Sequence, residues 1–331
     1  MDGPGCFVGI DMGTTNTRAW LVSGDRIVSR ARSAVGVRDT AVSGSAAGVR
    51  TAVGDLVARL AENARRDEGL APECVIAAGM VTSALGLAEV PHVPAPAGAA
   101  ELAGGAERHR FEELAGLDAW LLPGVRTGPL TLDAAQIGAA DVMRGEETLC
   151  VGLIADGILT AGAQLLNLGS HWKTIPIDGE GRIAGSSTSL SGELLHAAQT
   201  RTILSGSVPP DRPERISGAF FRAGMAEAER SGLARALFCV RLLEQRTRSD
   251  PAERLSFLAG AFVGAEIGAG AWGREEAGPV MIAGGEALAA AVAAAFRERG
   301  RGAAVLSPAQ VETAMLRGLR LVGGAAIAAR G

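Results

Sequence analysis

The stretch Phe7-Val8-Gly9-Ile10-Asp11-Met12-Gly13-Thr14-Thr15-Asn16-Thr17-Arg18-Ala19-Trp20-Leu21-Val22 is the most informative part of the sequence. Two apolar runs flank a short polar turn. Val, Ile, Thr and Trp favour strands, while Gly and Asn tolerate turns, so the stretch predicts an antiparallel hairpin. The backbone N–H groups of the turn could face an anion, and the Asp11 carboxylate beside it could hold a hydrated Mg²⁺ ion. An ordinary hairpin turn is the alternative, and the stretch alone supports both interpretations about equally.

Length and composition indicate two lobes and argue against nucleic acid as the main partner. The chain has 331 residues, whereas a single core usually stops growing at about 250–300 residues. The formal net charge is −4, so no basic surplus is available to neutralise phosphates. The four cysteines are widely spaced and show neither zinc nor disulfide spacing. We find neither a basic signal-peptide start nor the ~20-residue apolar run of a membrane span, and we expect a cytoplasmic protein with no membrane partner.

The first half of the chain predicts a mixed sheet. After the hairpin, residues 26–31 predict a third antiparallel strand, and residues 36–48 predict a polar loop. Residues 49–66 carry apolar side chains at helical spacing, and residues 73–80 form a short apolar run. Because a strand that follows a crossover helix is usually parallel to the first, we expect this run to extend the sheet in parallel.

A second stretch, residues 162–178, repeats the pattern of the first. An apolar strand leads into the turn Asn167-Leu168-Gly169-Ser170-His171, a strand returns, and residues 182–185 predict a third strand. The separation of roughly 155 residues is too long for a solenoid repeat. It indicates two lobes of similar design, which we place at residues 1–156 and 157–331.

The last third of the chain has a mainly helical pattern from Leu190 onward. Within it, residues 278–286 predict a strand that runs into the turn Gly284-Gly285 and a helix over 287–299. Pro308 suits the first turn of a closing helix. That helix could pack back on the first lobe or against another subunit, so a homodimer is one expectation.

Three features occur together: the Gly/Thr turn after Asp11, the turn at 167–171 and the late Gly284-Gly285 turn. Together they resemble the actin-like ATPase superfamily, which includes sugar kinases, heat-shock chaperones and actin. Four further stretches are similar to those of the 2-dehydro-3-deoxygalactonokinase family, in the same order along the chain. They are Ala78-Gly79-Met80-Val81-Thr82-Ser83, Val142-Met143-Arg144-Gly145-Glu146-Glu147-Thr148, Gly169-Ser170-His171-Trp172-Lys173 and Ser191-Gly192-Glu193-Leu194.

This resemblance implies an α/β fold with two actin-like (ribonuclease H-like) lobes and a nucleotide cleft between them. Each lobe would be a mixed sheet with flanking helices that opens with a three-stranded antiparallel meander. The implied reaction is the ATP-dependent phosphorylation of 2-dehydro-3-deoxy-D-galactonate at its 6-hydroxyl, a step of galactonate catabolism. ATP and Mg²⁺ are the implied cofactors, and the sugar acid is the other small-molecule partner.

The resemblance also assigns the nucleotide contacts. Asp11 would hold the metal through water, and the contacts to phosphates and adenosine would come from Gly13, Thr14, Thr15, Asn16, Gly169, Ser170, Gly284 and Gly285. The second turn departs from the superfamily pattern, because many relatives have Asp and Gly-Gly-Thr where this chain has Asn167-Leu168-Gly169-Ser170-His171. An acidic metal contact from this turn is therefore in question.

The block around Arg144 carries the candidate acid–base chemistry. A planar guanidinium suits bidentate capture of a substrate carboxylate, and an ion pair with Glu146 or Glu147 is the structural alternative. Adjacent glutamates in a helix point about 100° apart, so we expect one of them to face the reaction. By analogy with exopolyphosphatases we favour Glu146 as the general base, while Glu147, Glu193 and Asp141 remain competing bases.

Other polar residues are candidates for the sugar acid. His171 and Lys173 would share one strand face, with Trp172 on the other, and could bind a carboxylate. Ser83 could reach sugar hydroxyls, with a helix cap as its alternative role. Glu193 is a further candidate contact.

Three rival functions remain open at this point. The first is a kinase for another keto-deoxy sugar acid, because a single hydroxyl contact separates epimers. The second is a nucleotide-dependent switch without catalysis. The third is a polyphosphate or nucleotide phosphatase, suggested by the Glu-Glu pair.

Overall fold

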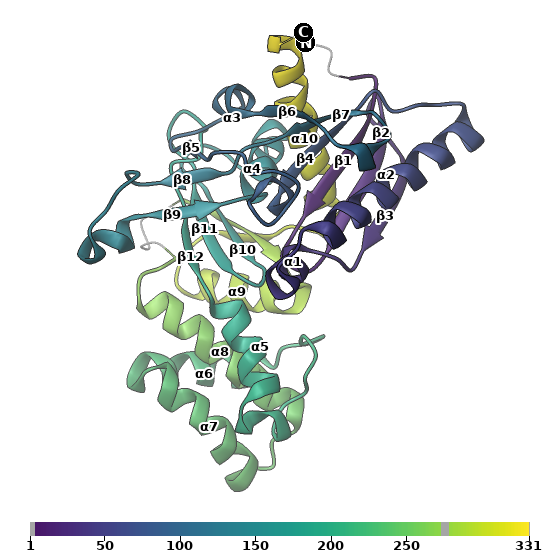
Figure 1. The fold of residues 1–331 in the computed structure, drawn as a ribbon. Helices are drawn as coiled ribbons and strands as arrows, with labels where there is room; N and C mark the ends of the chain where they lie inside the picture. The colour runs from purple at the N-terminus through teal and green to yellow at the C-terminus, as the bar shows by residue number, and fades with distance from the viewer. Residues whose placement is uncertain (1–3, 273–277, 331) are drawn as a thin grey trace. The chain divides into compact units, whose positions relative to one another are not determined.

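A computed structural model of the protein describes residues 4–272 and 278–330 and divides the chain into two compact units (Figure 1). Unit 1 comprises the residues up to Thr160, the short segment Gly181–Gly185 and the residues from Val311 onward. Unit 2 comprises Ala161–Glu180 and Ser186–Gln310. The lobe boundary at 156 and 157 stays a prediction.

The main sheet of unit 1 has six strands in the order β3-β2-β1-β4-β7-β6. Strand β1 pairs antiparallel with β2 and parallel with β4, which confirms the predicted hairpin and the predicted parallel extension. Every residue of β1 is buried, as expected of a strand covered on both faces. The strands are β1 (Cys6–Met12), β2 (Thr17–Ser23), β3 (Arg26–Ser33), β4 (Cys74–Gly79), β6 (Glu107–Arg110) and β7 (Asp118–Leu121).

Helices cover both faces of this sheet. On one face, Val8 and Ile10 of β1 share a hydrophobic cluster with Val49 and Val53 of α2. On the other, a Cβ built at Gly9 would lie 3.1 Å from Leu319 of α10, so the C-terminal helix packs on the N-terminal strand. The helices of unit 1 are α1 (Val37–Ser43), α2 (Ala47–Glu68), α3 (Ala99–Gly105), α4 (Glu146–Ala155) and α10 (Pro308–Arg330), the last of which begins in unit 2.

Short elements complete unit 1. A second sheet has three strands in the order β5-β8-β9. These elements are β5 (Val93–Pro94), β8 (Val125–Thr127), β9 (Asp141–Met143) and the 3₁₀ turns η1 (Met80–Thr82), η2 (Glu112–Leu114) and η3 (Ala134–Ala139).

The predicted loop over residues 36–48 is wrong, because helix α1 begins there. The Asp39 carboxylate accepts a hydrogen bond from the Gly36 N–H at 2.9 Å, and Gly44 ends the helix in the left-handed conformation. Val37 and Thr40 are buried. A seven-residue helix with two buried side chains leaves little periodicity in the sequence, and the polar composition conceals it.

Helices α4 and α10 approach each other unusually closely. A Cβ built at Gly152 would overlap the carbonyl of Ala314, and one built at Gly318 would overlap the carbonyl of Thr148. Only glycine permits backbones this close. The C-terminal helix therefore fixes the position of α4, whose first turn carries the adjacent glutamates Glu146 and Glu147.

The sheet of unit 2 has five strands in the order β12-β11-β10-β13-β14. Strands β10, β11 and β12 form an antiparallel meander, while β13 runs parallel to β10, so the topology of the first three strands and their parallel neighbour is that of unit 1. The strands are β10 (Gln164–Leu168), β11 (Trp172–Pro176), β12 (Ser187–Ser189), β13 (Val280–Gly284) and β14 (Ala303–Val305).

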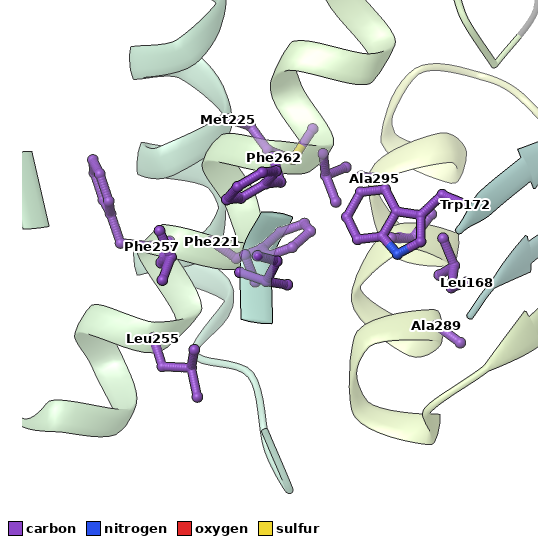
Figure 2. Close-up of a cluster of buried hydrophobic side chains, with 14 of the residues drawn as sticks. Leu168, Trp172, Phe221, Met225, Leu255, Phe257, Phe262, Ala289 and Ala295 are labelled. Carbon is purple, nitrogen blue, oxygen red and sulfur yellow. The ribbon is translucent and has the colours of Figure 1, made fainter. Parts of the chain in front are cut away.

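The core of unit 2 joins this sheet to its helices. Figure 2 shows Leu168 and Trp172 of the hairpin beside Ala289 and Ala295, with Phe221 and Phe262 among the aromatic side chains of the same cluster. Trp172 is 2% exposed, so the hairpin is anchored by its own strand side chains. The helical elements are α5 (Ser191–Arg201), η4 (Ile203–Gly206), α6 (Gly218–Ser231), α7 (Leu233–Arg246), α8 (Pro251–Gly268) and α9 (Glu286–Glu298).

The third strand predicted at residues 182–185 is wrong. Strand β12 at Ser187–Ser189 completes the meander instead, and the segment Gly181–Gly185 belongs to unit 1. There Ile183 is fully buried and exchanges two backbone hydrogen bonds with Ala97, at 2.9 and 3.0 Å. The apolar Ile183 therefore pairs with a different partner, which periodicity alone cannot reveal.

Candidate active site

The half-site of unit 1 forms where β1 and β4 end and α4 begins. Asp11 lies near the end of β1, Gly79 ends β4, and Gly145 precedes α4. A Cβ built at Gly79 would lie 3.3 Å from Asp11 Oδ1, and one built at Gly145 would lie 3.7 Å from it. Both glycines have positive φ values, of 84° and 105°. The chain therefore passes close to the carboxylate at two points where a side chain would crowd it.

Asp11 is 8% exposed, and its nearest cation is Arg18. The Arg18 Nη2 atom lies 3.0 Å from Asp11 Oδ2, because the two residues face each other across β1 and β2. Burial raises the pKa of the Asp11 carboxyl; the Arg18 guanidinium opposes this shift and the Glu146 carboxylate adds to it. Arg18 was not singled out from the sequence. The predicted hairpin places Arg18 opposite Asp11, and this pairing could have indicated an ion pair.

The turn Gly13–Asn16 projects into solvent from this half-site. Gly13, Thr15 and Asn16 are exposed, and the Asn16 amide donates to Thr15 Oγ1 at 2.9 Å. The Gly13 N–H donates to the Asn16 carbonyl at 2.8 Å, which closes the turn. This N–H is therefore bonded within the hairpin, and the phosphate contacts of Gly13, Thr14, Thr15 and Asn16 stay a prediction.

Glu146 and Glu147 have opposite environments. Glu147 is 1% exposed, and both of its carboxylate oxygens lie 2.8 Å from the Gly145 backbone nitrogen, which donates to them. Burial raises the pKa of Glu147 to about 8, with a further contribution from the charge of Glu146. Glu146 is half-buried and acts electrostatically on Asp11. The structure therefore separates a fully buried glutamate from a half-buried one whose charge acts on Asp11.

Arg144 connects the start of α4 to the loop after β4. Its Nη1 donates to Thr82 Oγ1 at 3.0 Å, and its Nη2 donates to the Val90 carbonyl at 2.7 Å and lies 3.4 Å from His92 Nδ1. Burial lowers the pKa of this guanidinium. Since Thr82, Val90 and His92 already take three of its five N–H groups, the side chain holds the loop and keeps limited capacity for a ligand.

Ser83 follows the 3₁₀ turn η1 and is half-buried. Its hydroxyl donates to the Met80 carbonyl at 2.7 Å. The residue therefore closes a turn, in place of the helix N-cap considered as its alternative role. Its oxygen lone pairs can still accept a hydrogen bond from a substrate hydroxyl.

The half-site of unit 2 is built on the turn Gly169–His171 between β10 and β11. The Glu193 N–H at the start of α5 donates to the Ser170 carbonyl at 2.8 Å. His171 precedes β11, and its Nε2 lies 3.5 Å from Glu193 Oε1, with both side chains partly exposed. The turn, the imidazole and the carboxylate therefore form one cluster, in which Glu193 orients His171.

Lys173 lies inside β11 and is 5% exposed, with its Nζ donating to Thr188 Oγ1 of β12 at 2.7 Å. We expected His171 and Lys173 to lie on the same face of one strand. His171 lies just before β11, so this expectation does not hold for it. His171 and Lys173 therefore occupy different environments beside the second turn.

The turn Gly284–Gly285 lies at the end of β13 and begins α9. A Cβ at Gly284 would lie 2.8 Å from Leu168 Cβ, so the strand end packs tightly against β10. An open groove of about 460 Å³ starts beside this turn and runs between α6 and α9. Its α9 wall is a stripe of alanines, and charged side chains stand at its edges: Glu214, Arg215, Arg222, Glu286 and Glu298. The groove offers a flat apolar wall of the size of a nucleobase.

The donor set around Asp11 fits a hard cation. Mg²⁺ prefers oxygen ligands and is usually held by one or two carboxylates together with substrate phosphates and water. Asp11 and Glu146 supply carboxylates here, and the described residues contain no group of three or more His, Cys, Asp or Glu side chains able to hold a metal ion by themselves. A metal in this half-site would therefore depend on the phosphates for part of its coordination.

Comparison with known proteins identifies relatives along nearly the whole chain. The family model described as 2-keto-3-deoxy-galactonokinase matches residues 11–322. The 2-dehydro-3-deoxygalactonokinase of Escherichia coli is 28% identical over 268 residues, covering 79% of both chains. A Rhizobium meliloti protein assigned the same activity is 29% identical over 300 residues, covering 89% of this chain and 90% of its own.

Solved structures agree with these matches. A crystal structure from Sinorhizobium meliloti, of a protein assigned as a 2-dehydro-3-deoxygalactonokinase, has a TM-score of 0.75 and 26% identity and covers 98% of this chain and 99% of its own. Component A of (R)-2-hydroxyglutaryl-CoA dehydratase from Acidaminococcus fermentans shares the fold at a TM-score of 0.50 and 14% identity, covering 98% of this chain and 99% of its own.

Across the described ranges 4–272 and 278–330, no helix is long and apolar enough to cross a membrane.

Proposed function

The chain belongs to the 2-keto-3-deoxy-galactonokinase family, and we propose that it transfers the γ-phosphoryl group of ATP to the 6-hydroxyl of 2-dehydro-3-deoxy-D-galactonate. The products are the 6-phosphate and ADP. The observation that carries this proposal is the family match over residues 11–322, which includes the Asp11 carboxylate and the adjacent glutamates of α4. Both relatives named above are described by this activity.

Asp11 is our candidate for holding Mg²⁺. The metal would offset the charge of the phosphates when it is bound. Asp11 lies between Gly79 and Gly145, so the backbone leaves space beside the carboxylate. Arg18 already neutralises this buried group at 3.0 Å, and on nucleotide binding its exposed guanidinium can turn to a phosphate oxygen.

The two turns supply the phosphate contacts. Thr14, Thr15 and Asn16 offer backbone N–H groups and polar side chains in unit 1, and Gly169 and Ser170 do so in unit 2. Phosphoryl transfer needs little covalent help from the protein, since positioning and electrostatic stabilisation supply most of the catalysis. Short turns at strand ends suit that task, because their backbone N–H groups can face an anion.

Glu146 is our candidate for the general base. It is half-buried and close enough to Asp11 to affect the pKa of that group, whereas Glu147 is buried and held by Gly145. A carboxylate beside the metal site can accept the proton of the attacking 6-hydroxyl. Glu147 then acts as a positioning residue for the start of α4.

The sugar acid requires cations for its carboxylate and polar groups for its hydroxyls. Lys173 and His171 are the candidates for the carboxylate, and Glu193 orients His171. Ser83 is the candidate for a hydroxyl contact. For Arg144 we propose an indirect role, because its guanidinium holds Thr82 and Val90 and so shapes the loop that carries Ser83.

The groove beside Gly284–Gly285 is our candidate for adenosine. Its alanine stripe offers contact to a flat base, and the absence of side chains on the two glycines lets the ribose approach the backbone. The charged residues at the edges can bind the polar rim of the base.

The test is a coupled ADP-release assay with a panel of keto-deoxy sugar acids, including the galactonate and gluconate epimers, followed by product analysis. We expect turnover that is highest on the galactonate epimer and a product phosphorylated at the 6-hydroxyl. Turnover on none of the sugar acids would refute the kinase proposal. The possible homodimer, one of the two alternatives raised by the sequence, is checked on the same preparation by light scattering.

A further inference from the structure

Gly36 presses directly against the back of the first phosphate turn. A Cβ built on Gly36 would lie 2.5 Å from the Thr14 carbonyl oxygen and 2.6 Å from the Thr15 nitrogen, both of which are backbone atoms. Gly36 has φ −145° and ψ −174°, an extended conformation that any residue adopts. Glycine is therefore required here by the contact alone.

Hydrogen bonds tie the same segment to the turn. The Arg38 N–H donates to the Thr14 carbonyl at 2.9 Å, and the Thr17 hydroxyl donates to the Val35 carbonyl at 2.8 Å. The Asp39 carboxylate holds the Gly36 N–H at 2.9 Å. One hydrogen bond donated by the segment, one accepted by it and the Gly36 contact therefore hold the turn and the start of β2 in place.

Unit 2 supports its own turn in the same way. A Cβ built on Gly192 would lie 2.5 Å from the Ser170 carbonyl oxygen and would also overlap the Gly169 carbonyl. The next residue, Glu193, donates its N–H to the same Ser170 carbonyl at 2.8 Å. Gly36 immediately precedes α1 and Gly192 lies in the first turn of α5, so each turn rests on a glycine at the start of a helix.

We propose that Gly36 and Gly192 are positioning residues for nucleotide binding, each of which sets the backbone of one phosphate turn. This inference rests on the proposed role of the two turns in holding phosphates. The close contact of each glycine with the turn backbone prevents the turn from shifting toward the helix. The backbone N–H groups of Arg38 and Glu193 fix the directions of the Thr14 and Ser170 carbonyls. The remaining turn N–H groups then point toward the ligand before it binds, which lowers the entropic cost of binding.

The test compares Gly36→Ala and Gly192→Ala with two matched controls. Gly48→Ala in α2 and Gly206→Ala in η4 add the same methyl group where no atom lies within 4 Å. The affinity of each full-length variant for ADP with Mg²⁺ is measured by isothermal titration calorimetry, and folding is followed by circular dichroism. We expect each test variant to lose about 10- to 100-fold in affinity, because small displacements of positioning groups have effects of this size. Both controls should match the wild type.

A milder variant covers the case in which Gly36→Ala does not fold. Asp39→Ala adds no volume and removes only the carboxylate that holds the Gly36 N–H. We expect a smaller loss of affinity for ADP, with the KM for the sugar acid unchanged. A general loss of stability would not weaken the affinity for ADP while leaving the KM for the sugar acid unchanged.

Wild-type affinity for ADP in folded Gly36→Ala and Gly192→Ala would overturn the proposal, and so would equal losses in the two controls. The calorimetric measurement of ADP affinity does not depend on turnover. If the wild type binds ADP but phosphorylates no sugar acid, the proposed reaction fails while the role of the two glycines is still decided by the binding data.

Discussion

Both carboxylate oxygens of Glu147 lie 2.8 Å from the backbone nitrogen of Gly145. This buried contact separates two glutamates that are adjacent in the sequence, because it turns Glu147 inward and leaves Glu146 half-buried beside Asp11. Each carboxylate can therefore be tested for a different role.

The first prediction concerns the general base. Glu146→Gln should lower kcat by about 10²- to 10⁴-fold, the usual contribution of acid–base catalysis, and leave ADP affinity nearly unchanged. Glu147→Gln keeps an oxygen that accepts from the Gly145 N–H, so its kcat should stay within about tenfold of the wild type. Steady-state kinetics on both variants measures this. A near-normal kcat for Glu146→Gln together with a large loss for Glu147→Gln would reverse the assignment.

The second prediction concerns stability and pH. The pKa of Glu147 is about 8 in the folded protein, above its ordinary value of 4.5. Between these two values the folded state binds a proton that the unfolded state has released. The contribution of Glu147 to the free energy of unfolding therefore falls as pH rises through this window, by at most about 1.4 kcal/mol per pH unit.

Urea unfolding of wild type and Glu147→Gln from pH 5 to pH 9 checks this prediction. The variant lacks the titrating group, so it should gain stability relative to the wild type as pH rises to about 8 and no further. Burial also raises the pKa of Asp11, so Asp11 adds its own pH dependence to the free energy of unfolding. Because both proteins contain Asp11, this contribution cancels when their free energies of unfolding are subtracted. A pH-independent difference would contradict the prediction.

The third prediction concerns the metal ligand. Asp11→Asn removes the carboxylate charge and keeps the shape of the side chain, so turnover should fall by about 10³-fold or more with the fold intact. Because burial disfavours the charge of Asp11, the variant should not lose thermal stability. Kinetics and thermal melts are compared with Asp25→Asn, which changes an exposed carboxylate in the turn after β2. Full activity of Asp11→Asn would remove the residue from the metal site.

The fourth prediction concerns the groove in unit 2. Ala290→Phe places a ring in the groove between α6 and α9 and should weaken ADP binding by about tenfold or more. Ala226→Phe adds the same ring on the exposed side of α6, outside the groove residues, and serves as the control. Calorimetry with ADP distinguishes them. Equal affinity of the two variants would place adenosine elsewhere.

The fifth prediction concerns the attachment of the C-terminal helix. Glu312 of α10 accepts a hydrogen bond from the Trp20 indole at 2.8 Å and pairs with Arg30 at 2.9 Å. Trp20 is 2% exposed, so Glu312→Ala leaves a buried donor without its partner and should cost about 1–3 kcal/mol of stability.

Glu68→Ala is the matched control, since it removes only the partner of the exposed Arg26 and should cost about 0–1 kcal/mol. The Arg30 guanidinium lowers the pKa of Glu312. The stabilisation by Glu312 is therefore present above its ordinary pKa and should disappear as pH falls through the lowered value. Equal costs for the two variants at pH 7 would rule out a special role for the Trp20 contact.

Several predictions from sequence are confirmed because they depend on local patterns. The opening hairpin, its parallel extension by β4 and the second hairpin follow from alternating apolar runs and turn residues. The family also follows from sequence, since its motifs are contiguous. The roles of the individual site residues stay predictions.

Other features were not predictable from the sequence because they depend on contacts between distant residues. The polar composition of residues 36–48 predicts a loop, yet helix α1 lies there and Gly36 at its start packs against the backbone of Thr14 and Thr15. The segment around Ile183 was assigned to the second meander, yet it pairs with Ala97. Arg144 stays a predicted carboxylate ligand, and the structure adds that its guanidinium is bonded to Thr82 and Val90.

The sequence by itself determined the two hairpins, the strands that extend them and the kinase family, and it supplied the candidate site residues. The tertiary structure decided which of those candidates are buried and which are bonded to the backbone, because burial and hydrogen bonding depend on what packs around a side chain. The sequence shows Glu146 and Glu147 as two adjacent glutamates and does not distinguish between them. They differ in the folded protein because one carboxylate is bonded to Gly145 inside the core and the other lies beside Asp11.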